Sequence, residues 1–297
     1  MPTTNAKVTV IIPTMATIER AELLKRAIRS IRVSSVSPIL ILAVVNGDRK
    51  DQGTCEWLQS QADIQFEYNA TPSAPAAVCR GRELVQTEYF STLDDDDEYL
   101  GLATDEKLKT MTLDVATDIV VTNGFRHKNG MDTMFYDNMD AIKSDPLASL
   151  MKGTWLHNCN ALYRTASVET EYFQDSHPYG EWTWLAFKLA MRKKTIRVLD
   201  KPLFRYNDTE GSLSKSEAYS NAYFSLFERM LDLRPPTSIK RQIQIKMGSA
   251  WHDAAVIALG QGKNADAWRR HLKSLAQPGG FKYLSFTRYL LRPSTGV

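Results

Sequence analysis

The sequence predicts an α/β fold, in which helices flank an open, Rossmann-like mixed sheet and a helical appendage follows at the C-terminus. Three observations predict it. Short apolar runs rich in β-branched residues alternate with segments of helical periodicity through the first two thirds of the chain. The loops between them are short, which is typical of parallel strands joined by right-handed crossovers. From about residue 216 the strand pattern stops, and only helical periodicity remains.

The first part of the chain contains four predicted strands and three predicted helices. The run KVTVIIP at residues 7–13 is apolar, rich in β-branched residues and ended by a proline, as expected of a buried strand. The next segment places Leu24, Ile28 and Ile31 on one face of a helix. The strands are predicted at residues 7–13, 38–45, 64–68 and 88–93, and the helices at 19–33, 51–60 and 74–86.

The rest of the chain extends the sheet and then becomes helical. A turn at Lys128-Asn129-Gly130 separates two strands of this middle region. Helices are predicted at residues 103–113, 141–151 and 182–192, and strands at 118–122, after residue 130, and at 160–163, 195–199 and 203–206. Four helices follow at residues 217–231, 238–259, 264–276 and 283–291. We therefore predict two domains, residues 1–214 and residues 215–297.

Charge is distributed unevenly along a chain of otherwise ordinary globular composition. The net charge of the 297 residues is +3. Residues 215–297 carry 13 Lys or Arg and 5 Asp or Glu, a net +8, which leaves −5 for residues 1–214. The basic tail suggests an anionic surface partner, such as phospholipid head groups or a diphosphate-linked acceptor. A solvated basic helical surface is the alternative. The small total charge gives no indication of nucleic-acid binding, and we predict none.

The cysteines and apolar runs bear on the cellular compartment. Cys55, Cys79 and Cys159 are odd in number and form no CxxC pair, so neither a disulfide framework nor a zinc site is expected. Residues 1–7 lack the apolar core of a secretory signal. The longest apolar run, at residues 39–45, is far shorter than the roughly 20 residues that a transmembrane helix needs. We predict a cytoplasmic protein, free or peripheral at the inner face of the membrane.

Five consecutive acidic residues, Asp94 to Glu98, follow the predicted strand at residues 88–93. In open α/β sheets, ligands bind at the carboxyl ends of the strands. Carboxylates this dense repel each other unless a cation compensates them, and two carboxylates can share one Mg²⁺ or Mn²⁺ with a bound diphosphate. The block therefore predicts a divalent-metal site. A solvated acidic loop is the alternative.

Several segments, in this order and spacing, carry a resemblance to a known family. Residues 10–14 (VIIPT) and 23–31 (LLKRAIRSI) resemble the opening of the family 2 glycosyltransferases, which have the GT-A fold. Residues 77–98 are similar to that family's basic helix, strand and DxD block. Residues 182–192 and 200–206 are similar to its closing helix and strands. The resemblance implies an inverting transferase that uses Mn²⁺ or Mg²⁺ to move a sugar from a nucleotide-diphosphate donor.

The resemblance, which spans residues 6–214, also implies a donor site. In this family the loop at Pro13 and Thr14 lines the nucleotide pocket through its backbone, and Glu19 lies within reach of the ribose or base. The second strand of the family ends in an aspartate that binds the base. This chain has Asn46 there, with Asp48 two residues on. An amide both donates and accepts, so Asn46 can still recognise a base. The departure from aspartate leaves the identity of the base open, and UDP- and dTDP-sugars are the donors we expect first.

Further residues match the family's diphosphate, metal and base positions. Arg80, with Arg82 beside it, matches a basic residue that approaches the donor diphosphate. Asp94 and Asp96 match the DxD pair, with Asp94 at the ribose or a metal-bound water and Asp96 on the metal. Asp95 and Asp97 assist them or face solvent. Asp208, beside Asn207, is a candidate third metal ligand where the family often has histidine.

The catalytic base is implied at the start of the helix at residues 182–192. The family usually has a Glu-Asp pair there, and this chain has Glu181 followed by Trp182. Glu181 is the first candidate for the base that removes the proton of the acceptor hydroxyl. Asp175 and His177 are nearby substitutes. The acceptor implied by the resemblance is a glycan or a lipid-linked glycoconjugate of bacterial surface polysaccharide synthesis.

Two other functions and two roles of the tail stay open. A nucleotidyltransferase normally has an early Gly-rich phosphate loop, and residues 13–20 contain no glycine. A non-catalytic module that binds a nucleotide-sugar or a metal is compatible with the missing second acid after Glu181. The segment FKYLSFTRYLL at residues 281–291 has the composition of a helix on a membrane surface. It equally suits packing on the body or on a second subunit of a homo-oligomer.

Overall fold

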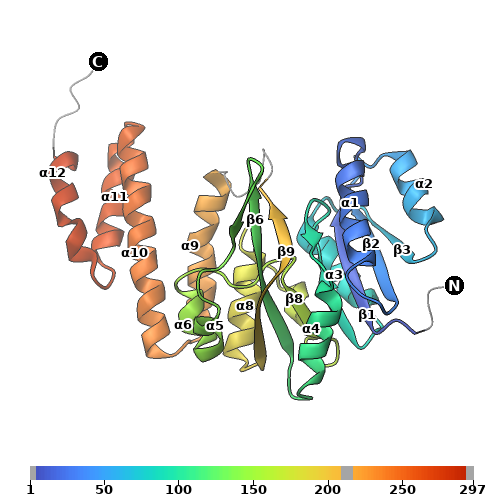
Figure 1. Cartoon of the computed structure of the whole chain (residues 1–297). Coiled ribbons are helices and arrows are strands. Elements are labelled where there is room, and N and C mark those ends of the chain that lie inside the picture. The colour runs from blue at the N-terminus through green and yellow to red at the C-terminus, as the bar shows by residue number, and fades with distance from the viewer. Residues whose placement is uncertain (1–4, 209–216, 292–297) are drawn as a thin grey trace. The chain divides into compact units, whose positions relative to one another are not determined.

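The computed structural model describes residues 5–208 and 217–291, and its course is shown in Figure 1. The chain divides into two compact units, Met1–Ser212 and Leu213–Val297. The predicted boundary at residue 214 falls among residues 209–216, outside the described residues. No helix in the described ranges combines the length and the apolar character that crossing a membrane requires.

The first unit is built on one mixed sheet, whose strands lie in the order β3-β2-β1-β4-β8-β6-β9-β5, with β7 paired to β6. Its strands are β1 (Val8–Thr14), β2 (Ile39–Asn46), β3 (Ile64–Asn69), β4 (Tyr89–Thr92), β5 (Glu98–Tyr99), β6 (Ile119–Lys128), β7 (Met131–Met134), β8 (Ala161–Arg164) and β9 (Ile196–Asn207). β1 to β4 are parallel neighbours, and β8 runs antiparallel to β4 and β6. β6 and β9 are parallel to each other, so β1 to β4, β6 and β9 all end at the same edge of the sheet.

The helices of the first unit cover both faces of this sheet. They are α1 (Ala21–Arg32), α2 (Gln52–Ser60), α3 (Ala74–Leu84), α4 (Ala103–Thr112), α5 (Asp140–Ser144), α6 (Pro146–Leu150), α7 (Glu171–Gln174) and α8 (Glu181–Met191), with a 3₁₀ turn η1 (Ile18–Arg20) before α1. Val10 and Ile12 of β1 pack into one core cluster with Leu24 and Ile28 of α1. The intervening Ile11 faces α3, because side chains alternate across a strand.

The contact between α3 and the sheet depends on a glycine. A Cβ atom built at Gly81 would lie 2.4 Å from Cγ2 of Ile11 and 3.3 Å from Cγ2 of Val44. No real side chain fits that space without moving the strands. Gly81 therefore lets α3 approach β1 and β2 closely, and this fixes the position of the α3 N-terminus at the carboxyl edge of the sheet.

Three predicted elements of the first unit differ from the structure. The helix predicted at residues 141–151 is broken into α5 and α6 at Asp145, whose backbone is extended (φ −153°, ψ 94°). The residue before a proline disfavours the helical region, and Pro146 then starts α6. The two strands predicted at 195–199 and 203–206 are one strand, β9, with a register shift opposite Asn123 that accommodates Pro202. β5 and α7 were not predicted from the sequence.

The second unit is helical throughout the range described, as the periodicity predicts. It contains α9 (Glu217–Asp232), α10 (Thr237–Gly260), α11 (Asn264–Leu275), a 3₁₀ segment η3 (Gly280–Phe286) and α12 (Thr287–Leu290). The last predicted helix, at residues 283–291, is divided: its first four residues belong to the 3₁₀ segment, which begins earlier at Gly280, and the next four form α12. Gly279, in the left-handed region at φ 74°, starts this change of direction.

Candidate functional site

The carboxyl edge of the sheet brings together the polar residues that end its strands. The register places the ends of β1, β2 and β3 side by side, with Thr14, Asn46 and Asn69 as their last residues. Asn46 is buried, and its Nδ2 donates to the carbonyl oxygen of Thr14 at 3.0 Å, so the amide ties the second strand to the first. Asp94 lies two residues after the end of β4, at this same edge. The strand order thus concentrates the predicted site residues in one place.

Three carboxylates of the acidic block converge. Asp94, Asp96 and Asp97 each offer an oxygen within 4.8 Å of the other two. Burial, followed by the charges of Asp96 and Asp95, raises the pKa of Asp94 to about 7. Burial, followed by the charge of Asp94, likewise raises the pKa of Asp97 well above its usual range. Carboxyl groups whose ionisation is this unfavourable gain the most from a divalent cation, which stabilises the ionised forms.

The backbone of the acidic block is held by residues from distant parts of the chain. Asn207 at the end of β9 donates from its backbone N to Oδ1 of Asp97 at 2.9 Å, and from Nδ2 to the carbonyl oxygen of Asp96 at 2.7 Å. Arg26 of α1 donates to the same carbonyl oxygen at 2.6 Å. These contacts fix the direction of the carboxylates. Asn207 therefore belongs to the site as a positioning residue.

Asp208, the predicted third metal ligand, is not one of the three converging carboxylates. Its backbone N donates to the carbonyl oxygen of His127 at 3.0 Å, and its Oδ2 lies 3.6 Å from Nζ of Lys128. Asp97, which the sequence suggests only as a helper of the DxD pair, takes the third place in the cluster instead.

Asp95 points away from this cluster into a buried ion pair. It is 3% exposed, and it accepts from Thr14 Oγ1 at 2.5 Å and from Arg20 Nε at 3.0 Å at both carboxylate oxygens. The guanidinium of Arg20 also lies 3.1 Å from Oδ2 of Asp96. These hydrogen bonds and charges raise the pKa of Arg20 further above its usual value. The sequence reasoning missed Arg20, which connects the β1–α1 loop to the metal-binding candidates.

A cavity of about 640 Å³ opens beside Arg20, between the β1–α1 and β2–α2 loops. Its lining carries the positive charges of Arg20, Arg49 and Lys50. It also includes Glu19, one of the predicted donor-binding residues. Its remaining lining residues are Met15, Thr17, Ile18 and Asp51. The lining has three cations and two carboxylates, and Arg20 connects it to the acidic block, so the cavity suits a ligand that has both phosphate groups and a bound metal.

Replacing Arg20 with methionine is expected to destabilise the fold by about 3 kcal/mol, because it leaves the buried Asp95 carboxylate without its cation. Urea unfolding at neutral pH measures the loss. The double variant Arg20→Met, Asp95→Asn removes the unpaired charge and is expected to recover about half of it. An Arg20→Met variant as stable as the wild type would show that the Arg20–Asp95 ion pair does not stabilise the fold.

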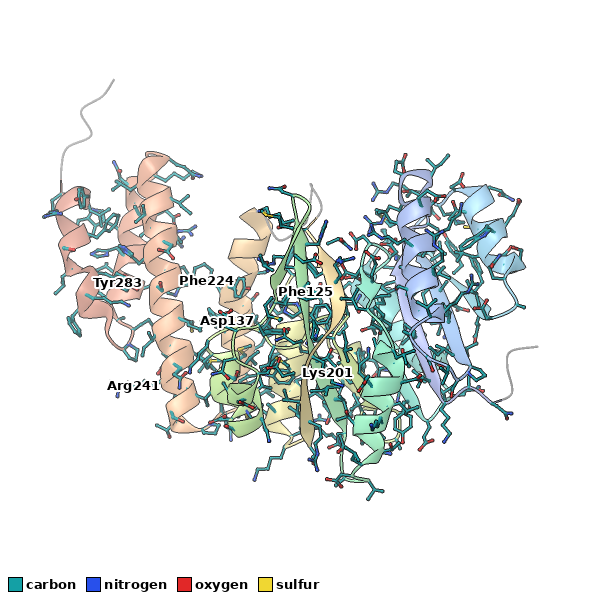
Figure 2. All side chains as sticks on the ribbon, viewed as in Figure 1. Phe125, Asp137, Lys201, Phe224, Arg241 and Tyr283 are labelled. Atoms are coloured by element: carbon teal, nitrogen blue, oxygen red, sulfur yellow. The ribbon has the colours of Figure 1, made fainter. Side chains whose placement is uncertain are left out.

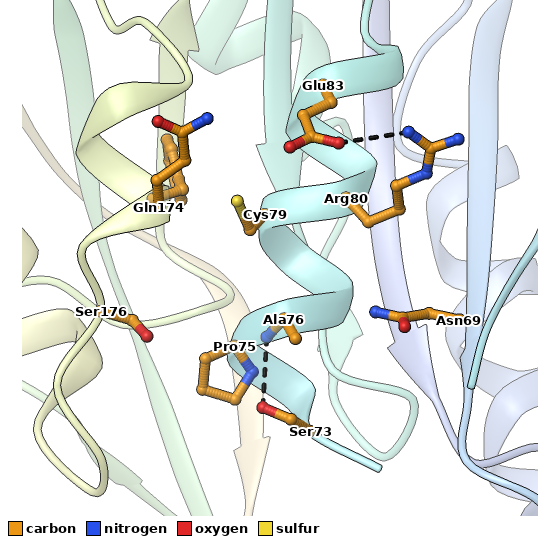
Figure 3. Close-up of a pocket in the computed structure, with 10 residues that line it drawn as sticks. Asn69, Ser73, Pro75, Ala76, Cys79, Arg80, Glu83, Gln174 and Ser176 are labelled. Carbon is orange, nitrogen blue, oxygen red and sulfur yellow. Dashed lines mark hydrogen bonds and ion pairs between the residues drawn. The ribbon is translucent and has the colours of Figure 1, made fainter. Parts of the chain in front are cut away.

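The predicted diphosphate ligand Arg80 lies elsewhere, on α3 (Figure 3). Its guanidinium pairs with Glu67 of β3 at 2.8 Å and with Glu83 at 3.2 Å. It lines a separate hollow of about 400 Å³, together with Asn69, Cys79, Gln174 and others. Neither partner of Arg80 belongs to the acidic block.

Arg82 is buried and donates to the backbone of Thr165 and Val168. Neither Arg80 nor Arg82 bonds to the acidic block, whereas Arg20 and Arg26 both do.

The other predicted nucleotide-binding residues lie along the same edge. Pro13 pairs with Val44 in the β1–β2 register and is buried. Asp48 is exposed and accepts a hydrogen bond of 2.5 Å from the hydroxyl of Tyr68. The side chain of Lys50 lies over the Tyr68 ring, 3.9 Å from its centroid. This group of polar and aromatic side chains adjoins the cavity through Lys50.

The candidate bases lie at the start of α8. Glu181 is its first residue and is partly buried, and this burial raises the pKa of its carboxyl. A raised pKa makes a carboxylate a stronger base at neutral pH. Asp175 is exposed, and its Oδ2 lies 3.2 Å from Nε1 of Trp184 and 3.8 Å from Nζ of Lys188. Of the two, Glu181 is the less exposed, which favours it as the candidate base.

Lys107 of α4 is buried beneath the site, at 1% exposure. Its Nζ lies 3.8 Å from the centroid of the Tyr99 ring and makes no hydrogen bond with the described residues. Burial lowers the pKa of Lys107 to about 7. The neutral amine is thus favoured in the folded state, so Lys107 destabilises the fold progressively as pH falls from about 10.5 to about 7.

We expect the variant Lys107→Met to be more stable than the wild type by about 2 kcal/mol near pH 6, because methionine needs no proton or hydration. Near pH 10 the gain is expected to be smaller. Urea unfolding of both proteins at the two pH values measures the difference. The same gain in the free energy of unfolding at both pH values would contradict the titration of Lys107.

The residues around the acidic cluster suit a hard divalent cation. Three carboxylates supply oxygen ligands, which Mg²⁺ and Mn²⁺ prefer. Asn158 donates to Asp94, while its own Oδ1 is buried without a hydrogen-bond partner among the described residues. An amide oxygen left without a partner beside carboxylates is a further candidate ligand. The donor set therefore fits the predicted metal.

Comparison with solved structures bears on the fold. Residues 1–349 of S. aureus TarS in complex with UDP-GlcNAc match with a TM-score of 0.56 and 15% identity, over 80% of this chain and 70% of that one. The same TarS fragment in complex with UDP matches with a TM-score of 0.56 and 14% identity, over 80% and 69%. The chain has the GT-A fold. A TarS structure of which 42% is covered gives a TM-score of 0.57 and 14% identity over 81% of this chain.

Sequence comparison gives no corresponding match. No family model matches the chain, and no curated protein matches it in sequence. The structural likeness, at 15% identity or less, establishes the architecture. The function has to be argued from the residues at the carboxyl edge.

Proposed function

We propose that this protein is a metal-dependent glycosyltransferase of the family 2 type, which transfers a sugar from a nucleotide-diphosphate sugar to an acceptor hydroxyl with inversion. The observation that carries the proposal is the cluster of Asp94, Asp96 and Asp97 at the carboxyl edge of a GT-A sheet, beside a cationic cavity. The structural neighbour in complex with UDP-GlcNAc supports a nucleotide-sugar donor.

In this proposal, the donor lies across the carboxyl edge. Asp94, Asp96 and Asp97 hold Mn²⁺ or Mg²⁺, which when bound neutralises charge on the donor diphosphate. Arg20 lies between the metal ligands and the cavity, and its Nη1 makes no hydrogen bond with the described residues. We assign it the diphosphate contact that the sequence suggests for Arg80. Arg49 adds a second cation to the same cavity.

The nucleoside end of the donor is assigned to the loops after β1 and β2. Thr14 and Asn46 are joined at this edge by the hydrogen bond from the Asn46 amide, and Glu19 lines the cavity. Asp48 and its partner Tyr68 offer a carboxylate and a ring beside Lys50. A pyrimidine base suits contacts with one amide and one aromatic ring, which agrees with a UDP- or dTDP-sugar.

Glu181 is proposed as the general base. Its carboxylate takes the proton of the acceptor hydroxyl while the oxygen forms a bond to the anomeric carbon and the bond to the donor diphosphate breaks. The diphosphate leaves with the bonding electrons, and Arg20 stabilises its charge. Attack from the face opposite the leaving group inverts the anomeric centre.

The acceptor is proposed to be a glycan or lipid-linked glycoconjugate of bacterial surface polysaccharide synthesis, as the family resemblance implies. A cytoplasmic protein, peripheral at the membrane, agrees with such an acceptor. A panel of hydroxyl acceptors, including short glycans and polyprenyl-diphosphate-linked sugars, assayed with the donor that binds would identify the class. We propose that the protein transfers the sugar to one of these acceptors faster than it hydrolyses the donor with water.

Release of nucleoside diphosphate from UDP-sugars in the presence of Mn²⁺ tests the proposal most simply. A competent transferase is expected to hydrolyse its donor slowly without an acceptor, and chelation with EDTA is expected to stop it. The matched control is Asp253→Ala, which removes an exposed carboxylate from α10 and should leave the rate unchanged. A protein that binds the nucleotide but releases no diphosphate with any donor or acceptor would support the non-catalytic binding module.

A further inference from the structure

The last described segment of the chain, η3 and α12, has two faces of different character. Its inner face packs within the second unit: Phe286 is 8% exposed, and Tyr283, labelled in Figure 2, stacks on His252 of α10 with ring centroids 4.2 Å apart. His252 and His271 also pack edge-on against Phe286. These contacts fix the segment to α10 and α11, and so determine which side chains face outward.

The outer face carries large apolar side chains. Phe281, Leu284 and Leu291 are 76%, 58% and 69% exposed. In a 3₁₀-helix residues three apart lie directly above one another, so Phe281 and Leu284 share one side. Leu291, the residue after α12, is exposed on the same segment. We call these three side chains the apolar stripe. A phenylalanine that is three quarters exposed, with two exposed leucines on the same segment, is informative because the unit that positions these side chains does not cover them.

Cations lie along the apolar stripe. Lys282 and Arg288 are exposed on the same segment. The Nζ of Lys282 lies 4.8 Å from the centroid of the Tyr283 ring, and the guanidinium carbon of Arg288 lies 4.8 Å from that of Tyr289. These contacts place each positive charge over the ring of the aromatic side chain that follows it. Apolar anchors flanked by cations over aromatic rings are the composition of interfacial helices.

The charge of the whole second unit agrees with this local pattern. Residues 215–297 carry a net +8, while residues 1–214 carry −5. No acidic residue occurs after Asp266, so the last 31 residues contain only basic charges. A protein or a second copy of this chain would need an acidic, apolar surface to match it. A phospholipid surface with anionic head groups supplies both properties in one layer.

We propose that the apolar stripe inserts into the interface of an anionic membrane, with Lys282 and Arg288 at the level of the head groups. The occupant of this surface is thus a lipid layer, bound parallel to the segment without any part of the chain crossing it. Both parts contribute: the apolar side chains enter the acyl boundary, and the cations attract the protein to the surface from solution. The proposal is independent of the function proposed for the first unit.

Co-sedimentation of the full chain with vesicles tests the proposal. Vesicles of phosphatidylcholine with about 30% phosphatidylglycerol are expected to bind the protein at least about tenfold more tightly than vesicles of phosphatidylcholine alone. Binding is expected to fall as NaCl is raised from about 0.05 M to about 0.5 M, because salt screens the attraction. Equal binding to both vesicle types, or none to either, would overturn the proposal.

Two variants distinguish vesicle binding through the apolar stripe from nonspecific binding by any exposed apolar side chain. The variant Phe281→Ser, Leu284→Ser, Leu291→Ser is expected to bind anionic vesicles at least about tenfold more weakly, with no change in net charge. The matched control is Leu113→Ser, Val115→Ser, which removes two apolar side chains that are 74% and 88% exposed in the first unit. The control is expected to bind like the wild type. Far-UV circular dichroism and a melting curve establish that each variant is folded.

Analytical ultracentrifugation of the same proteins distinguishes a second copy as the occupant. The proposal predicts that wild type and stripe variant have the same mass in solution without vesicles. A wild-type dimer that the stripe variant loses, together with vesicle binding that it keeps, would assign the surface to self-association and overturn the proposal.

Discussion

In the presence of Mn²⁺, the variant Asp96→Ala is expected to bind nucleoside diphosphates about 100-fold more weakly, or weaker still. Mutating residues that only hydrogen-bond to metal ligands already lowers metal affinity by about 10- to 100-fold. Asp96 is one of three carboxylates whose oxygens lie within 4.8 Å of one another, and its Oδ2 also contacts Arg20. Isothermal titration with Mn²⁺ present measures the loss.

Two comparisons make this result specific. The metal-free protein should be as stable as the wild type or slightly more so after the substitution, because one of the mutually repelling carboxylates is gone. Asp253→Ala should bind like the wild type. If Asp96→Ala kept its Mn²⁺-dependent binding, the carboxylate cluster would not be the metal site, and the metal dependence of the proposed reaction would be wrong.

Replacing Glu181 with glutamine is expected to lower the rate of sugar transfer by about 10²- to 10⁴-fold while leaving donor binding intact. Glutamine has nearly the same shape but cannot take the proton of the acceptor hydroxyl. Because burial raises the pKa of Glu181, the wild-type rate is expected to rise with pH through a midpoint above the ordinary glutamate value. That step in the pH profile should be absent in the variant.

The same assay assigns the base between its two candidates. Asp175→Asn is expected to retain most of the wild-type rate, because its carboxylate is exposed and already contacts Trp184 and Lys188. Near-normal turnover by Glu181→Gln together with a large loss in Asp175→Asn would move the base to Asp175. An equal, small loss in both would place it outside these two residues.

The fold follows from the sequence where local pattern and tertiary structure agree. The runs at β1 and β2 are apolar because both faces of those strands are covered over most of their length, so their position and type are predictable without a structure. Disagreements occur where long-range pairing decides. β9 continues through Pro202 only because a shift in the register opposite Asn123 accommodates it. The two-residue strand β5 exists only through its pairing with β9.

The site is partly predictable for a related reason. A dense acidic block after a buried strand indicates a ligand site at the edge of the sheet. The structure places the block at this edge. Which carboxylates converge depends on the contacts of Asn207 with the block, and these arise 110 residues away in the sequence. Asp95 likewise turns toward Arg20, 75 residues earlier. An arginine at the start of a helix has no local feature that indicates such a partner.

The contrast between Arg20 and Arg80 shows the same limit. Arg20 lies at the start of α1 and Arg80 lies in the middle of α3, and position in the family pattern favours Arg80. Its pairing with Glu67 and Glu83 depends on the packing of α3 against β3, which no sequence period reveals. Position relative to the sheet edge, rather than order along the chain, decides which cation lies beside the acidic block.

The central claim, a metal-assisted nucleotide-diphosphate site at the carboxyl edge of the sheet, is tested most directly by thermal unfolding with UDP, dTDP, GDP and CMP, each with and without Mn²⁺. A ligand at about 100 times its dissociation constant stabilises the native state by about 2.7 kcal/mol, which raises the melting temperature by several degrees. We expect this rise for UDP or dTDP, and only when Mn²⁺ is present. No shift with any nucleotide, or the same shift without the metal, would contradict the account.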